Sequence, residues 1–213
     1  MDRRKSGIYF MNPWRSFGMN QKTLIITLGA LAVAINVIAG TVVGSLKIPF
    51  LFLDVIGTIF IAAVYGPFWG ALVGILTNLV LGVTSGYSSI PFALVNATVG
   101  LIVGYTARKF GYTLRSALVS GFLLGIVCPA IGTVIAIGVF GGLTGGVQDI
   151  AVLWLKQAGS SLFASAFLPR LAENLIDKIL SALLVYYVIQ GIPQSLLKRP
   201  AKRGSKGAPH AAQ

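Results

Sequence analysis

Residues 48–83 read IPFLFLDVIGTIFIAAVYGPFWGALVGILTNLVLGV, an almost wholly apolar run that contains one acid, Asp54, and one Gly66-Pro67 break. A soluble domain does not bury so long an apolar run, whereas two bilayer-crossing helices joined by a tight turn account for it. We therefore expect a multi-pass membrane protein, in which the few polar residues at membrane depth mark the sites of function.

The composition supports a membrane protein and argues against several other classes. Of the 213 residues, 55% are hydrophobic and 10% are charged, against about 25% charged residues in ordinary globular domains. The net charge of +12 comes from Lys and Arg residues in short segments between apolar runs, which is the positive-inside pattern rather than a nucleic-acid-binding face. One cysteine, Cys128, and one histidine, His210, exclude an internal disulfide and a metal site built from several such residues.

Six apolar runs predict an all-α membrane protein with six transmembrane helices in one bundle. The first run is too long for the core of a secretory signal peptide, and further spans follow it. The less apolar residues 147–168 are expected to form an interfacial or partly inserted helix, or the outer end of a kinked sixth span, with Pro169-Arg170 interrupting it. The six runs are 24–46, 50–65, 68–83, 90–106, 117–140 and 171–189.

The distribution of basic residues predicts the orientation. If both termini are cytosolic, six spans place most of the 17 Lys and Arg residues inside the cell. The chain then divides into a basic cytosolic segment over residues 1–21, a six-helix transmembrane domain over residues 22–192, and a basic cytosolic tail over residues 193–213 that we expect to be disordered.

Small residues recur four positions apart in several spans, where they share one helix face and let another backbone approach closely. Each pair either packs inside this bundle or docks another membrane subunit. The pairs and triplets are Ala30 with Ala34, Gly40 with Gly44, Gly66 with Gly70 and Gly74, Gly100 with Gly104, and Gly121 with Gly125.

Charged residues at membrane depth are candidate ligand contacts. Asp54 could cap the second span, pair with Lys47 or hold a polar group of a ligand. Glu173 and Asp177 share one helix face, where the two acids repel each other unless a cation pairs with them. Arg170 and Lys178 are the nearest cations, and Lys178 shares its face with Asn174. This cluster forms either a structural ion network or a ligand site facing the bundle interior.

Several uncharged polar and aromatic residues are also candidate ligand contacts. Asn78 and Asn96 are lone amides in the third and fourth spans, where such groups more often bond across helices than bind ligands. Tyr87 and Trp154 lie near predicted membrane boundaries, so they either belong to an aromatic belt or stack on a flat ligand.

No catalytic motif is present: the chain lacks a Walker A sequence, a nucleophile elbow and a dinucleotide fingerprint. Two other classes remain open beside a binding protein. An autonomous secondary transporter or channel for a small polar solute would need paired broken helices, and Gly66-Pro67 has no matching break in the other half of the chain. An intramembrane enzyme would have Glu173 and Asp177 as its only acid pair.

Several segments together resemble a known family. Residues 53–58 (LDVIGT) and 65–74 (YGPFWGALVG) resemble the second and third spans of substrate-binding S components of energy-coupling factor (ECF) transporters. Residues 92–97 (FALVNA), followed by Gly100 and Gly104, are similar to the fourth span. Residues 139–145 and 174–180 fit a subset of the family. The resemblance covers residues 22–192.

The resemblance implies a small multi-pass protein of a prokaryotic cell membrane that captures a vitamin or related micronutrient outside the cell. Such S components work without a cofactor and are not enzymes; they pair with a transmembrane coupling subunit and two cytosolic ATPases of an ABC transporter. Ala30 and Ala34 match the family's docking face on the first span. The family's pocket falls here near Lys47, Asp54, Tyr87, Asn96, Trp154, Arg170, Glu173, Asn174 and Lys178.

Overall fold

The computed structural model describes residues 21–46, 48 and 51–192, and the regular structure in these ranges is entirely helical. The terminal segments, including the predicted disordered tail, lie outside the described residues, and so does Lys47. The described helices are α1 (Gln21–Ser45), α2 (Ile56–Tyr65), α3 (Pro67–Thr84), the 3-10 helix η2 (Tyr87–Phe92), α4 (Ala93–Phe110), α5 (Leu114–Phe140), α6 (Asp149–Gln157) and α7 (Leu162–Gly191).

Four of these helical stretches are long and apolar enough to cross a bilayer: Lys22–Ser45, Pro67–Thr84, Tyr87–Phe110 and Leu114–Phe140. A fifth apolar helix, α2, has 10 residues and so rises about 15 Å, half of a hydrocarbon core of about 30 Å. The last helix, α7, has 30 residues but carries four charged side chains. All four are buried, which is how charges are tolerated at membrane depth.

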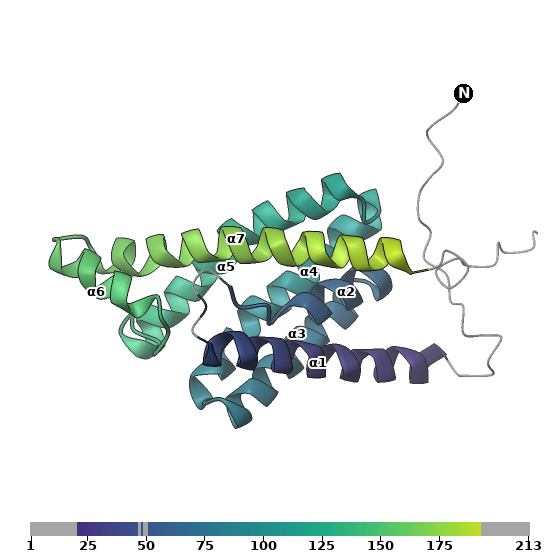
Figure 1. Cartoon of the computed structure of the whole chain (residues 1–213), viewed down its shortest axis with the longest axis horizontal. Helices are drawn as coiled ribbons and strands as arrows, with labels where there is room; N and C mark the ends of the chain where they lie inside the picture. Colours follow the sequence, from purple (N-terminus) through teal and green to yellow (C-terminus); the bar gives the residue numbers. More distant parts are fainter. Residues whose placement is uncertain (1–20, 47, 49–50, 193–213) are drawn as a thin grey trace, which may run out of the picture.

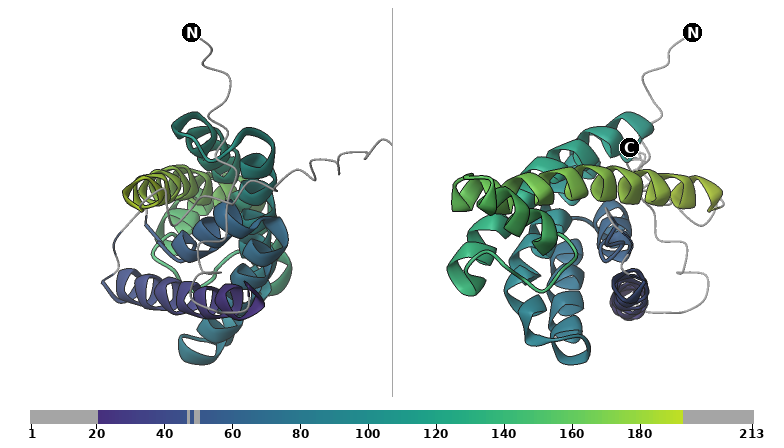
Figure 2. Two further views of the ribbon diagram at one scale, coloured as in Figure 1. Left: turned by 90° about the vertical axis from the view of Figure 1, so that its right-hand side faces the viewer. Right: turned by 60° about the vertical axis from the view of Figure 1, so that its left-hand side comes forward.

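The helices form one bundle with α2 at its centre. The pair α5 and α7 and the pair α3 and α4 pack along each other, while α2 contacts α1, α3, α4 and α7. Figure 2 shows α2 between α1 and α7, which do not touch each other in the described part of the chain. In Figure 1, the described start of α1, the end of α7 and the turn between α4 and α5 lie at one end, and α6 lies at the other.

The predicted second span, residues 50–65, is helical only from Ile56, so the expected start of this helix was wrong. The preceding residues from Leu51 are not helical, and Leu53 has a φ of 53°, a left-handed conformation that non-glycine residues seldom adopt. A carboxylate of α7 accepts hydrogen bonds from two backbone N–H groups of this segment, so tertiary contacts replace the helical ones.

The expected break at Pro169 was also wrong, because α7 begins seven residues earlier at Leu162 and continues through this proline. Ser161 caps the helix by accepting a hydrogen bond from Ala164 N at 3.2 Å, which moves its start upstream. The stretch 147–168 therefore contains two structures: α6 is a separate short helix, and residues from Leu162 onward are the first part of α7.

Most of the glycine stripes are used inside the bundle. A Cβ placed on Gly100 would lie 2.3 Å from backbone atoms of α3, and one on Gly104 would lie 2.3 Å from Pro67. A Cβ placed on Gly121 or on Gly125 would lie 2.9 Å from a backbone Cα atom of α7. Packing is therefore the role of these stripes, since only glycine admits such short backbone distances.

Substituting Gly100 tests the close contact between α3 and α4. We expect Gly100→Ala to lower stability by about 1–3 kcal/mol, because the new methyl group meets backbone that cannot rotate away. The check is thermal unfolding of the purified chain in detergent. Gly138→Ala is the matched control, since a Cβ on Gly138 meets nothing within 4 Å. Equal melting temperatures of the two variants would contradict the packing.

Candidate functional site

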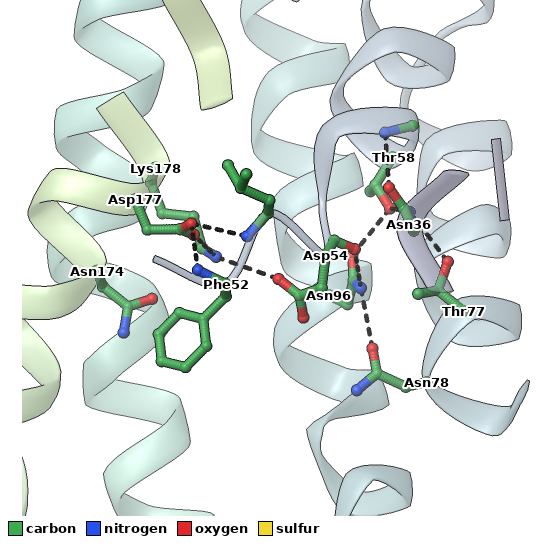
Figure 3. Close-up of polar contacts among 12 residues, drawn as sticks. Asn36, Phe52, Asp54, Thr58, Thr77, Asn78, Asn96, Asn174, Asp177 and Lys178 are labelled. Atoms are coloured by element: carbon green, nitrogen blue, oxygen red, sulfur yellow. Dashed lines mark hydrogen bonds and ion pairs between the residues drawn. The ribbon is translucent and has the colours of Figure 1, made fainter. Parts of the chain in front are cut away.

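Buried amides and hydroxyls connect four helices in a continuous chain of hydrogen bonds (Figure 3). Asn36 of α1 donates to Thr58 Oγ1 of α2 and to Thr77 Oγ1 of α3, each at 3.0 Å, and accepts from Gly57 N at 2.7 Å. Thr58 Oγ1 donates in turn to Asn96 Oδ1 of α4 at 2.9 Å. These groups satisfy one another without water, as polar groups inside a membrane protein must.

The chain of hydrogen bonds ends beside η2. Asn96 Nδ2 donates to Asn78 Oδ1 at 2.9 Å, and Asn78 Nδ2 donates to the carbonyl of Ser89 at 3.0 Å. The interpretation that Asn78 and Asn96 bond across helices is confirmed. Their amides hold η2 and the start of α4 against α3, which positions one wall of the site described below.

A second buried polar cluster ties α7 to the segment before α2. Asp177 Oδ1 accepts hydrogen bonds from Phe52 N at 2.8 Å and Leu53 N at 2.9 Å, and its Oδ2 accepts one from Lys178 Nζ. Asp177 is fully buried and Lys178 is 4% exposed. The expected pairing of this acid with a cation of α7 is confirmed, and it anchors a stretch of backbone that lacks helical hydrogen bonds (Figure 3).

Asp54 faces the same lysine from the opposite side. Its Oδ1 lies 3.8 Å from Lys178 Nζ but accepts no hydrogen bond, although this oxygen is buried. Asp54 does not cap α2, whose N-cap is Val55 without a side-chain hydrogen bond, so that expectation was wrong. Two carboxylates thus share one ammonium group, which leaves Asp54 short of a hydrogen-bond donor.

Arg170 has no acidic partner in the described part of the chain, although it is only 5% exposed. Its Nη1 donates to the carbonyl of Ala166 at 2.7 Å. Its Nη2 donates to the carbonyl of Gly142 at 3.2 Å and to Thr144 Oγ1 at 3.3 Å. These bonds orient the guanidinium group, but they do not neutralise its charge.

Both clusters border one cavity of about 330 Å³. Asp54, Asn174, Lys178 and Arg170 supply polar groups, while much of the remaining wall is apolar and includes the ring of Phe92. A mainly apolar hollow with a few convergent polar groups is the usual form of a small-molecule site, and this volume is near the lower end of the range of about 300–1,000 Å³. Beyond these five, its lining includes Phe52, Val55, Asn78, Leu81, Ser88, Ser89, Val95, Asn96, Val99, Cys128, Pro129, Gly132, Thr144, Gly145, Gly146 and Gln148.

The structure brings most of the predicted site residues together. The five that line this cavity are Asp54, Asn96, Arg170, Asn174 and Lys178. Glu173 lines a neighbouring cavity instead. Tyr87 and Trp154 are 80% and 69% exposed and line neither cavity. Lys47 lies outside the described residues.

The sequence analysis did not single out three further residues that belong to the buried polar clusters or to the cavity lining. Asn36 is a lone amide of the first span, and this signal alone could have placed it with Asn78 and Asn96. Thr144 and Gln148 belong to the glycine-rich connection after α5, which lacks the spacing of a phosphate loop but does line the cavity. Their role depends on the path of the connection across α7, which the local sequence does not encode.

Comparison with protein families gives an independent result. The family model described as ECF transporter, substrate-specific component, matches residues 22–189. Neither a curated protein nor a solved structure gave a significant match to the chain. The matched range extends from the start of α1 almost to the end of α7 and so contains the cavity and both polar clusters. The chain therefore belongs to the family of substrate-specific components of ECF transporters, which are substrate-binding transporter subunits and not enzymes.

Proposed function

We propose that this S component captures a vitamin or related micronutrient outside the cell and presents it for ATP-driven import. The cavity between the segment before α2, η2 and α7 carries the proposal, because it combines apolar walls with several polar side chains, one of which, Asp54, has a buried oxygen without a hydrogen bond. A ligand that satisfied those groups would bind tightly, since an unmade buried hydrogen bond is costly.

The charges around the cavity indicate what its ligand offers. Arg170 would bind an anionic group or a strong hydrogen-bond acceptor of the ligand, and Asp54 Oδ1 would accept a hydrogen bond from a donor of the ligand. Asn174 of α7 adds a further polar group to the cavity wall. The volume of about 330 Å³ suits a small vitamin or vitamin precursor better than a corrinoid macrocycle.

The proposed topology has six membrane crossings with both termini cytosolic. They are made by α1, by α2 together with the non-helical residues 51–55 before it, and by α3, η2 with α4, α5 and α7. Several features support it: α1 starts and α7 ends at the same end of the bundle (Figure 1), and the α4–α5 turn with its basic residues lies there too. Of these basic residues, Arg108 packs against Gly66 in the turn between α2 and α3. The cavity lies nearer the end that carries α6, which this topology makes extracellular in a prokaryotic cell membrane.

The first helix offers a docking face for a transmembrane coupling subunit that works with two cytosolic ATPases. Ala30 and Ala34 are exposed, unlike the glycines of α3, α4 and α5 that pack within the bundle. Ile26, Leu31 and Ile38 of the same helix are also exposed. A small-residue stripe on an otherwise apolar outer face permits close approach of a second membrane helix.

The decisive test of the proposed function is what the purified full chain carries and what it binds. We expect mass spectrometry to find one retained micronutrient, and affinity purification from the native membrane to recover a coupling subunit with two ATPases. Ion-driven uptake by the chain alone in liposomes would instead make it an autonomous secondary transporter and would overturn the proposal.

Removing the charge of Arg170 should weaken binding of the retained molecule. We expect Arg170→Gln to raise its dissociation constant about tenfold to hundredfold, the range for one charge-assisted hydrogen bond in a buried site. Arg170→Lys should keep part of the affinity, because it keeps the charge. Lys156→Gln is the control, since Lys156 is an exposed cation of α6. Titration calorimetry of the three variants checks this, and unchanged binding by Arg170→Gln would exclude the role.

Enlarging the alanine face should separate docking from ligand binding. We expect Ala34→Trp to abolish co-purification of the coupling subunit while leaving the affinity for the micronutrient unchanged, because the residue is remote from the cavity lining. Val42→Trp places the same side chain at another exposed position of α1, and this variant should still co-purify with the coupling subunit. Loss of the partner in both variants would argue against a specific alanine face.

A further inference from the structure

Glu173 is a buried acid whose side chain forms no ion pair or hydrogen bond within the described part of the chain. Its side chain belongs to a residue that is 7% exposed, and its Oε2 is fully buried and accepts no hydrogen bond. A carboxylate oxygen in this state loses its water without compensation, and the cost falls when a donor or cation is supplied.

Arg170, the nearest cation N-terminal to Glu173 on the same helix, forms no ion pair with it. Arg170 precedes Glu173 by three residues, a spacing at which oppositely charged side chains on a helix normally meet. No ion pair joins them, and the guanidinium group instead contacts backbone carbonyls and Thr144. The helix therefore presents a positive group to the substrate cavity and, one turn later, a negative group to a different space.

That space is a second cavity of about 430 Å³. Its walls come from the end of α1 (Val43, Gly44), the residues before α2 and the connection before α6, and they are largely apolar apart from Glu173 and Gln148. Phe52, Gly145, Gly146 and Gln148 line both cavities, so the two are neighbours with a shared wall.

We propose that this second cavity is a subsite for an organic cation, in which Glu173 binds a protonated amine or another cationic nitrogen. Resting on the proposed function, the inference names the substrate class: a micronutrient that carries a cationic nitrogen, which binds at Glu173. The apolar surroundings strengthen the attraction, because they exclude the water that would screen it. The carboxylate then gains a donor that none of the described residues provides.

The experiment uses a probe that carries only the cationic end. Propylammonium chloride is titrated into the purified full chain in detergent, with sodium chloride at equal ionic strength as reference and 1-propanol as a neutral analogue of the same shape. We expect propylammonium to raise the melting temperature and 1-propanol to have little effect. Glu173→Gln should weaken propylammonium binding about tenfold or more, and Glu173→Asp should retain part of it.

Two control variants locate the effect. Ser181→Ala removes another buried oxygen that lacks a hydrogen bond but lines neither cavity, and it should leave the response intact. Lys156→Gln removes an exposed cation of α6 that lines neither cavity, and it should likewise preserve the response. The inference is overturned if Glu173→Gln responds like the wild type, if Ser181→Ala loses the response as well, or if 1-propanol stabilises as strongly as propylammonium.

Other outcomes distinguish the inference from the proposed function. A double-mutant cycle in which Lys47→Gln destabilises the chain and Glu173→Gln adds nothing would show that Lys47 neutralises Glu173, and the subsite would be excluded. If Glu173→Gln does not fold, the comparison of Glu173→Asp with the wild type still decides the matter. A chain that binds propylammonium at Glu173 but recovers no ATPases keeps the subsite and loses the importer role.

Discussion

The architecture of the site depends on one buried carboxylate, Asp177, which replaces helical hydrogen bonds in the backbone before α2. It accepts from two consecutive N–H groups and from Lys178, so both of its oxygens have hydrogen-bond donors. Without it, Phe52 and Leu53 would have unsatisfied amides inside an apolar bundle, or the chain would extend α2 and fill the cavity. The irregular backbone is tolerated because it lines a cavity within the protein.

The need of buried polar groups for hydrogen-bond partners also explains how the two polar clusters differ. The hydrogen bonds from Asn36 through Thr58 to Asn96 and Asn78 give each of these side chains a partner, so this cluster connects α1, α2, α3 and α4. The cluster on α7 is incomplete, because Asp54 and Glu173 each retain a buried oxygen without a donor. These two oxygens lie on residues that line the two adjoining cavities, which is where the proposed ligand groups would supply the missing donors.

Much of the fold follows from local properties of the sequence. The apolar runs predicted the helical class and most of the long helices, because hydropathy depends on composition over a short window. The spacing of Gly100 with Gly104 predicted close helix packing, which the α3–α4 contact confirms. The charged cluster of α7 also stood out, since acids and bases are rare in apolar runs and must face the protein interior.

Other features depended on contacts between distant residues. The start of α2 at Ile56 follows from a carboxylate more than a hundred residues away, and no window around Leu53 contains that information. The separation of Arg170 from Glu173 into two cavities depends on the path of the connection after α5. Composition and periodicity therefore specified which segments are helical and which are buried, because each is a property of neighbouring residues. The bundle alone determined which buried polar groups find partners, because hydrogen bonds and cavities are formed by segments that only folding brings together.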